Sequence, residues 1–337
     1  MSGSVEFLSA SEAARRLGVS AKALRLYERR GLVTPVRTAA GWRAYGPGQM
    51  ARAGEIAVLR ALGLSLAQVA RVLDGDPRDL EPALAAHQAA LEGQARDLAG
   101  TLEKVRGMRA RLTGGQAPAA GDLSGLVGAG PSVAFDLPWP WGGERFELRD
   151  IAPLTYIVGP LGSGKTRLAM RLAQELPGGG FLGLDRGKEG ALARLAADRE
   201  LKARVEQVLA WLVEDGARPS EAMSVLLVGL EFDGPLVVDM VEQGLDEDAQ
   251  AALIAHLRRR APGRPPLFLM TRSSSILDLA AVGPNEAILL CPANHAVPTR
   301  VAPCPGAPGY EAVATCLAPP EVRARTEGVI AWRPDAA

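Results

Sequence analysis

The chain has 337 residues, its 38 Lys/Arg are balanced by 38 Asp/Glu, and 47% of its residues are hydrophobic. This length predicts two or three domains, each large enough to bury its own core. No apolar run approaches the ~18 residues that span a bilayer, and residues 1–9 lack the basic region and apolar core of a signal peptide. The three cysteines are too few for a disulfide framework, so we expect a protein of the reducing cytoplasm.

The charge is unevenly distributed along the chain. Residues 1–60 contain ten Lys/Arg and four Asp/Glu, a net charge of +6, so the remainder carries −6. A basic N-terminal segment in a neutral chain indicates a polyanionic partner at that end.

The first elements predict a helix-turn-helix. One helix begins after Ser9, a good N-cap, and ends at Gly18. A second helix is predicted over residues 21–30, and it is rich in cations. Two short helices joined by a Gly-containing turn are typical of this DNA-reading motif. The second helix carries an exposed stripe of cations that can enter a major groove, formed by Lys22, Arg25 and Arg29.

The next segments predict a hairpin and two more helices. Residues 35–45 predict a hairpin wing, with Arg37 and Arg43 on its arms. The helices are predicted at residues 48–62 and 65–73.

A family resemblance covers about residues 6–112. The sequence ALRLYERRGLV at residues 23–33 resembles the recognition helix of the MerR family of bacterial transcription regulators, and GWRAY at residues 41–45 resembles that family's wing. The two helices after the wing also resemble the family through a set of apolar positions that includes Ile56, Leu59 and Val69.

The resemblance implies a winged helix-turn-helix dimer that binds a palindromic promoter. Family members usually twist or bend an over-long promoter spacer so that RNA polymerase can engage both promoter elements. The sequence departs from the family at Leu26, where a second tyrosine is common, so one contact is in doubt. The alternative to DNA binding is that these cations form only a basic, solvated surface on the helices. By position, the resemblance implies DNA contacts, mostly to phosphates, from Arg25, Tyr27, Arg37, Arg43 and Tyr45.

A long helix is predicted from Asp76 to about Leu112. The resemblance implies that residues 77–112 form an antiparallel dimerisation helix, and hence a homodimer. Gln94 and Thr101 weaken the apolar seam, and His87 is expected to mark register in it and not to bind a ligand. A heptad repeat held this long indicates a coiled coil, with a seam formed by Leu84, Leu91, Leu98, Val105 and Leu112.

Residues 114–132 are rich in Gly, Ala and Pro and predict a flexible linker. The predicted domains are therefore a DNA-binding domain (1–75), a dimerisation helix (76–113) and a nucleotide-binding domain (133–337). Metal-sensing members of the MerR family carry effector-binding cysteines just after the dimerisation helix. None lies there in this sequence, which argues against a metal sensor.

The sequence GPLGSGKT at residues 159–166 fits the phosphate-binding P-loop, G-x-x-x-x-G-K-[ST]. A predicted buried strand over residues 154–158 precedes it, and a predicted helix follows. Glycines let the backbone wrap a triphosphate, lysine supplies charge near the β and γ phosphates, and the threonine hydroxyl is offered to Mg²⁺. The expected nucleotide-binding residues are Gly159, Gly162, Ser163, Gly164, Lys165 and Thr166.

A second apolar run, residues 236–238, predicts a buried strand that ends in Asp239. This arrangement is typical of a Walker B carboxylate, so Asp239 is expected to hold Mg²⁺ opposite Thr166. ATP and Mg²⁺ are therefore the expected cofactors. The expected fold is multidomain: an all-α winged helix-turn-helix with a long coiled-coil helix, then an α/β P-loop NTPase domain.

The sequence DMVEQGLD at residues 239–246 is similar to the Walker B and D-loop run of ABC-type ATPases. The resemblance implies that an aromatic residue upstream of the P-loop, Trp139 or Trp141, stacks on adenine. The alternative for both tryptophans is a place in the core at a strand edge.

The sequence departs from the ABC pattern where hydrolysis is carried out. Met240 occupies the position of the catalytic glutamate, and Arg272 occupies that of the switch histidine. Loss of a general base costs ~10²–10⁴ in rate, so we expect intact binding and slow hydrolysis. Glu242 is the one alternative base.

Three functions remain open. The first is a regulator whose ATP-binding domain alters promoter distortion, the second an ATPase tethered to DNA, and the third a regulator with a relic P-loop that responds to another ligand. The C-terminal thiols match no closed zinc pattern and are expected to be idle, namely Cys291, Cys304 and Cys316.

Overall fold

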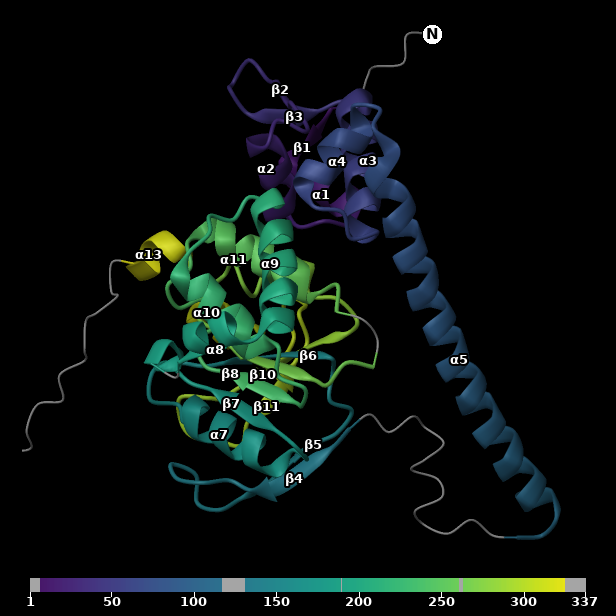
Figure 1. Ribbon diagram of the computed structural model, residues 1–337, viewed down its shortest axis with the longest axis vertical. Coiled ribbons are helices and arrows are strands. Elements are labelled where there is room, and N and C mark those ends of the chain that lie inside the picture. The colour runs from purple at the N-terminus through teal and green to yellow at the C-terminus, as the bar shows by residue number, and fades with distance from the viewer. Residues whose placement is uncertain (1–6, 117–130, 189, 261–262, 325–337) are drawn as a thin grey trace, which may run out of the picture.

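The computed structural model describes residues 7–116, 131–188, 190–260 and 263–324. A helical N-terminal unit (residues 7–79) sits at one end of an α/β unit, here called the P-loop unit (residues 131–324) (Figure 1). One long helix extends away from both units. Among the described residues, no helix is both long and apolar enough to cross a membrane.

The N-terminal unit begins with the two predicted short helices. Ser9 and Ser20 cap them, because each hydroxyl accepts a hydrogen bond from a backbone N–H three residues on. Gly18 has φ 67° and ends the first helix in the left-handed conformation. The helices are α1 (Ala10–Leu17), α2 (Ala21–Arg29), α3 (Pro47–Ala61) and α4 (Leu66–Leu73).

A small antiparallel sheet completes this unit. The predicted hairpin is present as two short strands, and a third strand from the start of the chain pairs with it in the order β1-β3-β2. The helices and the sheet enclose a core of their own, to which Leu24, Tyr45 and Ile56 contribute fully buried side chains. The strands are β1 (Leu8–Ser9), β2 (Val36–Arg37) and β3 (Arg43–Tyr45).

The long helix α5 (Leu80–Thr113) follows a short 3-10 turn, η1 (Pro77–Asp79). Its 34 residues correspond to about 50 Å of helix. The helix is confirmed, but its pairing with a second copy remains a prediction. The predicted seam lies exposed along it, with exposed fractions of 47–64% at Leu84, Leu91, Leu98 and Leu112.

The P-loop unit is built on a six-stranded sheet in the order β11-β10-β6-β9-β8-β7. All neighbouring pairs are parallel except β10 with β11. The parallel strands are buried on both faces, as their continuous apolar sequences predict. The strands are β6 (Leu154–Val158), β7 (Gly180–Leu182), β8 (Leu236–Val238), β9 (Leu267–Met270), β10 (Glu286–Leu290) and β11 (Thr299–Val301).

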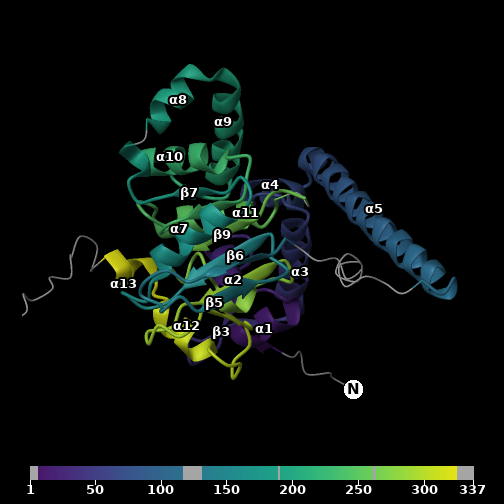
Figure 2. The same ribbon diagram turned by 90° about the horizontal axis from the view of Figure 1, so that it is seen from below.

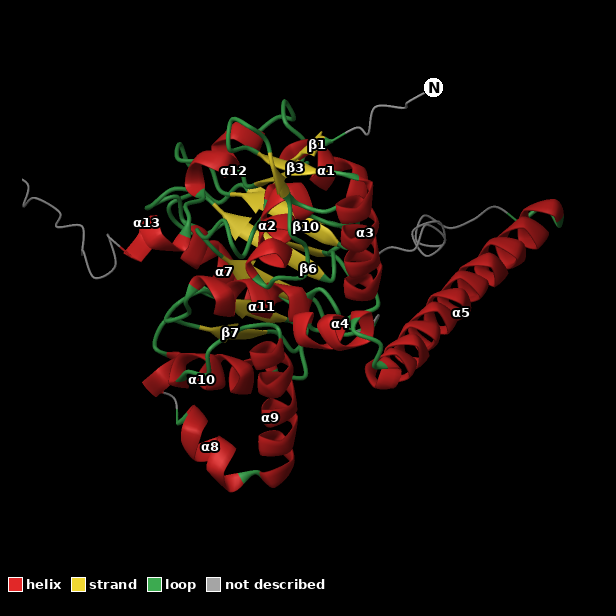
Figure 3. Ribbon diagram, turned by 90° about the horizontal axis from the view of Figure 1, so that it is seen from above, coloured by secondary structure: helices red, strands yellow, loops and turns green. Residues whose placement is uncertain are grey.

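Helices cover both faces of this sheet (Figure 3). On one face lie α7 (Lys165–Glu175) and a separate hairpin of β4 (Val133–Asp136) and β5 (Arg145–Leu148). Figure 2 shows α8 (Ala191–Ala197), α9 (Arg199–Glu214) and α10 (Glu221–Leu230) beyond the β7 edge. The other helices are α11 (Glu247–Leu257), α12 (Tyr310–Cys316), α13 (Pro320–Ala324) and the turns η2 (Arg186–Lys188) and η3 (Leu279–Ala281).

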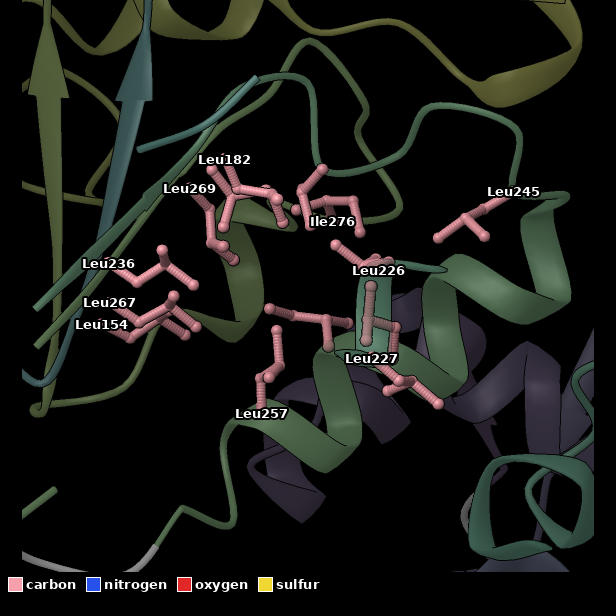
Figure 4. Packing of buried hydrophobic residues seen from close by; sticks show 14 of the residues in the cluster. Leu154, Leu182, Leu226, Leu227, Leu236, Leu245, Leu257, Leu267, Leu269 and Ile276 are labelled. Carbon is pink, nitrogen blue, oxygen red and sulfur yellow. The ribbon is translucent and has the colours of Figure 1, made fainter. Parts of the chain in front are cut away.

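Alternate residues of each central strand enter two different cores, because successive side chains of a strand point to opposite faces. Leu267 and Leu269 pack against leucines of α10 and α11 (Figure 4), whereas Phe268 and Met270 pack on the α7 side. The sheet is thereby held from both sides, and the loops at its carboxyl end are fixed in position.

Candidate functional site

The P-loop follows β6 directly and turns back into α7. Gly162 and Gly164 have φ of 79° and 86°, a conformation that favours glycine. Space is also restricted at this turn. A Cβ at Gly164 would lie 2.5 Å from the Trp141 ring, and a Cβ at Gly159 would collide with the carbonyl oxygen of Cys291. The glycine spacing is therefore required by the local backbone geometry.

Lys165 lies within the loop and not in solvent. Only 9% of the residue is exposed, and its Nζ donates to the carbonyl oxygen of Pro160 at 2.6 Å. Ser163 Oγ lies 3.4 Å from the same nitrogen. Burial lowers the pKa of Lys165. A buried ammonium held by one carbonyl can exchange that acceptor for a stronger, anionic one.

Thr166 and Asp239 meet at the carboxyl ends of β6 and β8. The Thr166 side chain lies beside the Asp239 carboxylate, which is buried. Burial raises the pKa of Asp239, and the charges of Arg186 and Lys165 oppose that rise. Hydroxyl and carboxylate oxygens are the ligands that Mg²⁺ prefers. The two residues that the sequence assigned to one metal therefore lie together.

Arg186 was not found from the sequence. It is 4% exposed, and its guanidinium donates to the backbone carbonyls of Asp239 at 2.9 Å and Met240 at 3.1 Å. It therefore holds the turn that positions the Asp239 carboxylate. No motif identifies an arginine that acts on backbone carbonyls 53 residues away.

Glu242, the alternative base, is a buried structural carboxylate. Its Oε1 accepts from the backbone N–H of Arg272 at 2.9 Å and pairs with Arg323 at 2.7 Å. Its Oε2 is buried and has no hydrogen-bond partner among the described residues. Met240, at the position of the missing base, has φ 41° and holds the turn between β8 and this carboxylate.

The structure separates the two candidate tryptophans. Trp141 is buried, and its indole N–H donates to the carbonyl oxygen of Ala296 at 3.1 Å, so it belongs to the core beneath the P-loop. Trp139 is 75% exposed and is the one available to stack on a base. His295 places its Nε2 3.0 Å from the Gly162 carbonyl oxygen, a contact with the P-loop that the sequence did not predict.

The cysteines form no metal centre in the described part of the chain. No group of three His, Cys, Asp or Glu side chains there could hold an ion. Cys291 is buried, and burial raises the pKa of its thiol to about 12. A thiol with that pKa stays protonated and inert near neutral pH.

The two tyrosines expected to contact DNA are core residues. Tyr27 is 4% exposed and Tyr45 is fully buried. The Tyr45 hydroxyl donates a hydrogen bond to the Glu28 carboxylate within this unit. The expectation that these side chains reach DNA is therefore not met in this conformation, because their rings fill the space between α1, α2 and α3.

The cations of this unit are divided between two surroundings. Arg25 is exposed. Arg37 donates to the Gly41 carbonyl oxygen at 2.9 Å, and Arg43, 40% exposed, pairs with Glu28 at 2.7 Å. Lys22 and Arg29, by contrast, contact the P-loop unit. The predicted stripe of three cations is thus not wholly free.

Comparison with known proteins agrees with the N-terminal architecture. A family model described as MerR HTH family regulatory protein matches residues 8–76. The chain is 34% identical over 128 residues to a probable heavy metal-dependent transcriptional regulator of Haemophilus influenzae. That match covers 36% of this chain and 100% of the relative.

Solved structures resemble separate parts of the chain. The HTH-type transcriptional regulator SkgA from Caulobacter crescentus is 30% identical, covers 36% of this chain and 87% of its own, and has a TM-score of 0.24. The SMC head domain from Thermotoga maritima is 12% identical, covers 52% of this chain and 98% of its own, and has a TM-score of 0.37. At these TM-scores neither likeness supports an argument about function.

Proposed function

This chain belongs to the MerR HTH family of regulatory proteins, and from that premise we propose that it is a promoter-binding regulator controlled by ATP and Mg²⁺. In this proposal residues 1–75 bind double-stranded promoter DNA. Residues 76–113 form the dimerisation helix of a homodimer, and residues 133–337 bind the nucleotide. RNA polymerase responds indirectly, through the altered promoter.

The observation that carries the nucleotide proposal is the grouping of Lys165, Thr166 and Asp239 at the carboxyl ends of parallel strands. Ligands of open α/β sheets bind at that edge. Lys165 would exchange the Pro160 carbonyl for the β and γ phosphates, and the loop N–H groups would surround them. Thr166 and Asp239 would hold Mg²⁺, which neutralises charge on the phosphates when bound.

Sensing is favoured over rapid hydrolysis. Met240 carries a thioether, which accepts no proton from water, and both Glu242 interactions hold its Oε1 in place. A general base must accept a proton from the attacking water; a thioether cannot, and the Glu242 Oε1 is already held by two donors. The ATPase with a helix-turn-helix tether is therefore the less favoured alternative.

Two segments, which follow β8 and β9, connect the proposed nucleotide site to the α2 contacts. Asp248, nine residues after Asp239, contacts Arg29 of α2. Ser274, two residues after Arg272, accepts a hydrogen bond from Lys22. A shift of either loop on nucleotide binding would therefore act directly on α2. This route is shorter than a relay through the long helix.

The test is a calorimetric titration with ATP and Mg²⁺ of the wild type, Lys165→Ala and Lys104→Ala. Lys104 is exposed on α5 and serves as the matched control. We expect binding by the wild type and the control and none by Lys165→Ala, because the variant leaves the phosphate charge unbalanced.

Absence of ATP binding by the wild type would instead favour the relic P-loop that responds to another ligand. Phosphate release near 10 s⁻¹, a typical enzyme turnover, would favour the tethered ATPase.

A further inference from the structure

One face of α2 is turned towards the P-loop unit. Lys22 Nζ donates to the Ser274 carbonyl oxygen at 2.5 Å. Arg29 Nη2 lies 3.2 Å from Asp248 Oδ1. Lys22 and Arg29 are seven residues apart, so they lie on one side of the helix, two turns from each other. Both belong to the stripe expected to read DNA.

The surface that faces this stripe carries three carboxylates, beside Arg258 and small apolar residues. Glu247 and Asp248 stand in the first turn of α11, and Asp278 lies in the loop after β9. Burial lowers the pKa of Lys22, and the charges of Asp278 and Glu247 act against that effect. A cavity of about 300 Å³ separates the two surfaces at this point. Asp248 thus occupies a contact of Arg29 that the proposed DNA-binding role would give to a phosphate.

A second patch fixes the orientation of the two units. Arg60 of α3 makes a two-point ion pair with Asp215 at the end of α9. The Asp215 side chain is 1% exposed and also accepts from the Leu66 backbone N–H at 2.9 Å. Beside it, Ser65 Oγ donates to Glu214 at 3.0 Å. Buried, multiply bonded charge pairs demand one geometry.

In each unit, a glycine lies directly against an arginine side chain of the other unit. Gly63 has φ 90°, and a Cβ there would lie 2.5 Å from Arg259 Nε. Gly216 has φ 107°, and a Cβ there would collide with the guanidinium of Arg30. Arg259 in turn stacks on the Trp211 ring, 4.5 Å from its centroid. Close approach of backbone glycines to arginines on both sides indicates a specific, closely packed interface between the two units.

We propose that the P-loop unit and DNA are alternative partners of α2, so that the free chain is closed and DNA binding requires the two units to part. This inference rests on the proposed DNA-binding role of α2. A major groove about 12 Å wide admits one α-helix. With α11 and the β9 loop held against Lys22 and Arg29, α2 cannot enter it.

The test compares the wild type with two opening variants and one control. Asp248→Arg reverses the charge opposite Arg29, and Asp215→Ala removes the partner of Arg60 without adding positive charge. Asp136→Arg makes the same charge change as Asp248→Arg on β4, at the opposite end of the P-loop unit (Figure 1). The probe is a duplex that covers the DNA directly upstream of the gene for this chain.

Two readouts are taken on each protein without nucleotide: the duplex Kd, and the acetylation rate of Lys22 relative to Lys104. We expect both opening variants to bind the duplex about tenfold more tightly, because a closed state reduces apparent affinity by the fraction that is open. Lys22 acetylation should rise in both variants and stay at the wild-type rate in Asp136→Arg.

Equal Kd values and equal Lys22 acetylation in all four proteins would overturn the competition and leave the DNA-binding proposal intact. If Asp248→Arg binds the duplex more tightly while Lys22 acetylation stays at the wild-type rate, the gain comes from the added positive charge and not from separation of the units. That result would also overturn the competition. If no protein binds the duplex, the DNA-binding proposal itself fails. The Asp248 side chain is 34% exposed, so that variant serves even if Asp215→Ala does not fold.

Discussion

At the scale of single residues, Glu242 shows that a carboxylate close to a catalytic position in the sequence can have a structural role once it is buried. It lies two residues from the expected catalytic site, yet the Arg272 N–H and the Arg323 guanidinium hold its Oε1. A carboxylate in that setting fixes the loops after β8 and β9 relative to each other. We therefore attribute to it the positioning of Arg272 and not proton abstraction.

A buried histidine gives the residue-scale prediction. Burial lowers the pKa of His256 to about 4, with help from the charges of Arg259 and Arg260. Because the unfolded chain binds a proton near pH 6.5 and the folded chain binds it only near pH 4, the contribution of His256 to stability is fully present above pH 6.5 and is lost progressively below it. The unfolding free energy should fall as pH drops from about 6.5 to about 4.

Urea unfolding at half-unit pH steps measures this, with His256→Asn as the comparison. The difference in slope between the two proteins should approach about 1.4 kcal/mol per pH unit within the window. Identical slopes would mean that His256 is protonated equally in the folded and unfolded states.

At the scale of elements, local signals predicted much of the fold. Capping residues and apolar periodicity predicted α1, α2, α5 and the strands β6 and β8, because those signals are encoded within a few residues. Boundaries were less accurate: the long helix expected from Asp76 is preceded by a 3-10 turn, and α5 itself begins at Leu80.

Long-range contacts could not be predicted in the same way. Arg60 and Asp215 are 155 residues apart, and neither stands in a motif. The burial of Tyr27 and Tyr45 could not be predicted for a related reason. An aromatic residue in a recognition helix can face DNA or the core, and only the packing of α1 and α3 shows that Tyr27 faces the core.

The exposed seam of α5 gives the element-scale prediction. Leu91 and Leu98 are 50% and 64% exposed, so a second copy would bury apolar area worth about 25 cal/mol per Å². Leu98→Lys should shift the protein from dimer to monomer in sedimentation velocity.

Ala110→Lys, on the opposite side of the same helix, should leave the dimer unchanged. A dimer that persists in Leu98→Lys would place the contact elsewhere on the molecule.

At the scale of the whole molecule, the two proposed binding sites share a short mechanical connection. The loops that leave β8 and β9 near Asp239 and Arg272 continue to the contacts with Arg29 and Lys22. A tenfold change in a coupled equilibrium needs about 1.4 kcal/mol. Smooth bending of a DNA site costs on the order of 1–6 kcal/mol, so a coupling of that tenfold size would be comparable to the lower end of this range.

The central claim is that the nucleotide state of the P-loop unit alters how the N-terminal unit engages its promoter. The most direct measurement is a nuclease footprint of the duplex upstream of this gene, with and without a saturating non-hydrolysable ATP analogue and Mg²⁺. We expect the protected bases or the cleavage pattern of the spacer to change with nucleotide in the wild type and to stay unchanged in Lys165→Ala. Identical footprints of the wild type in both conditions would contradict the claim.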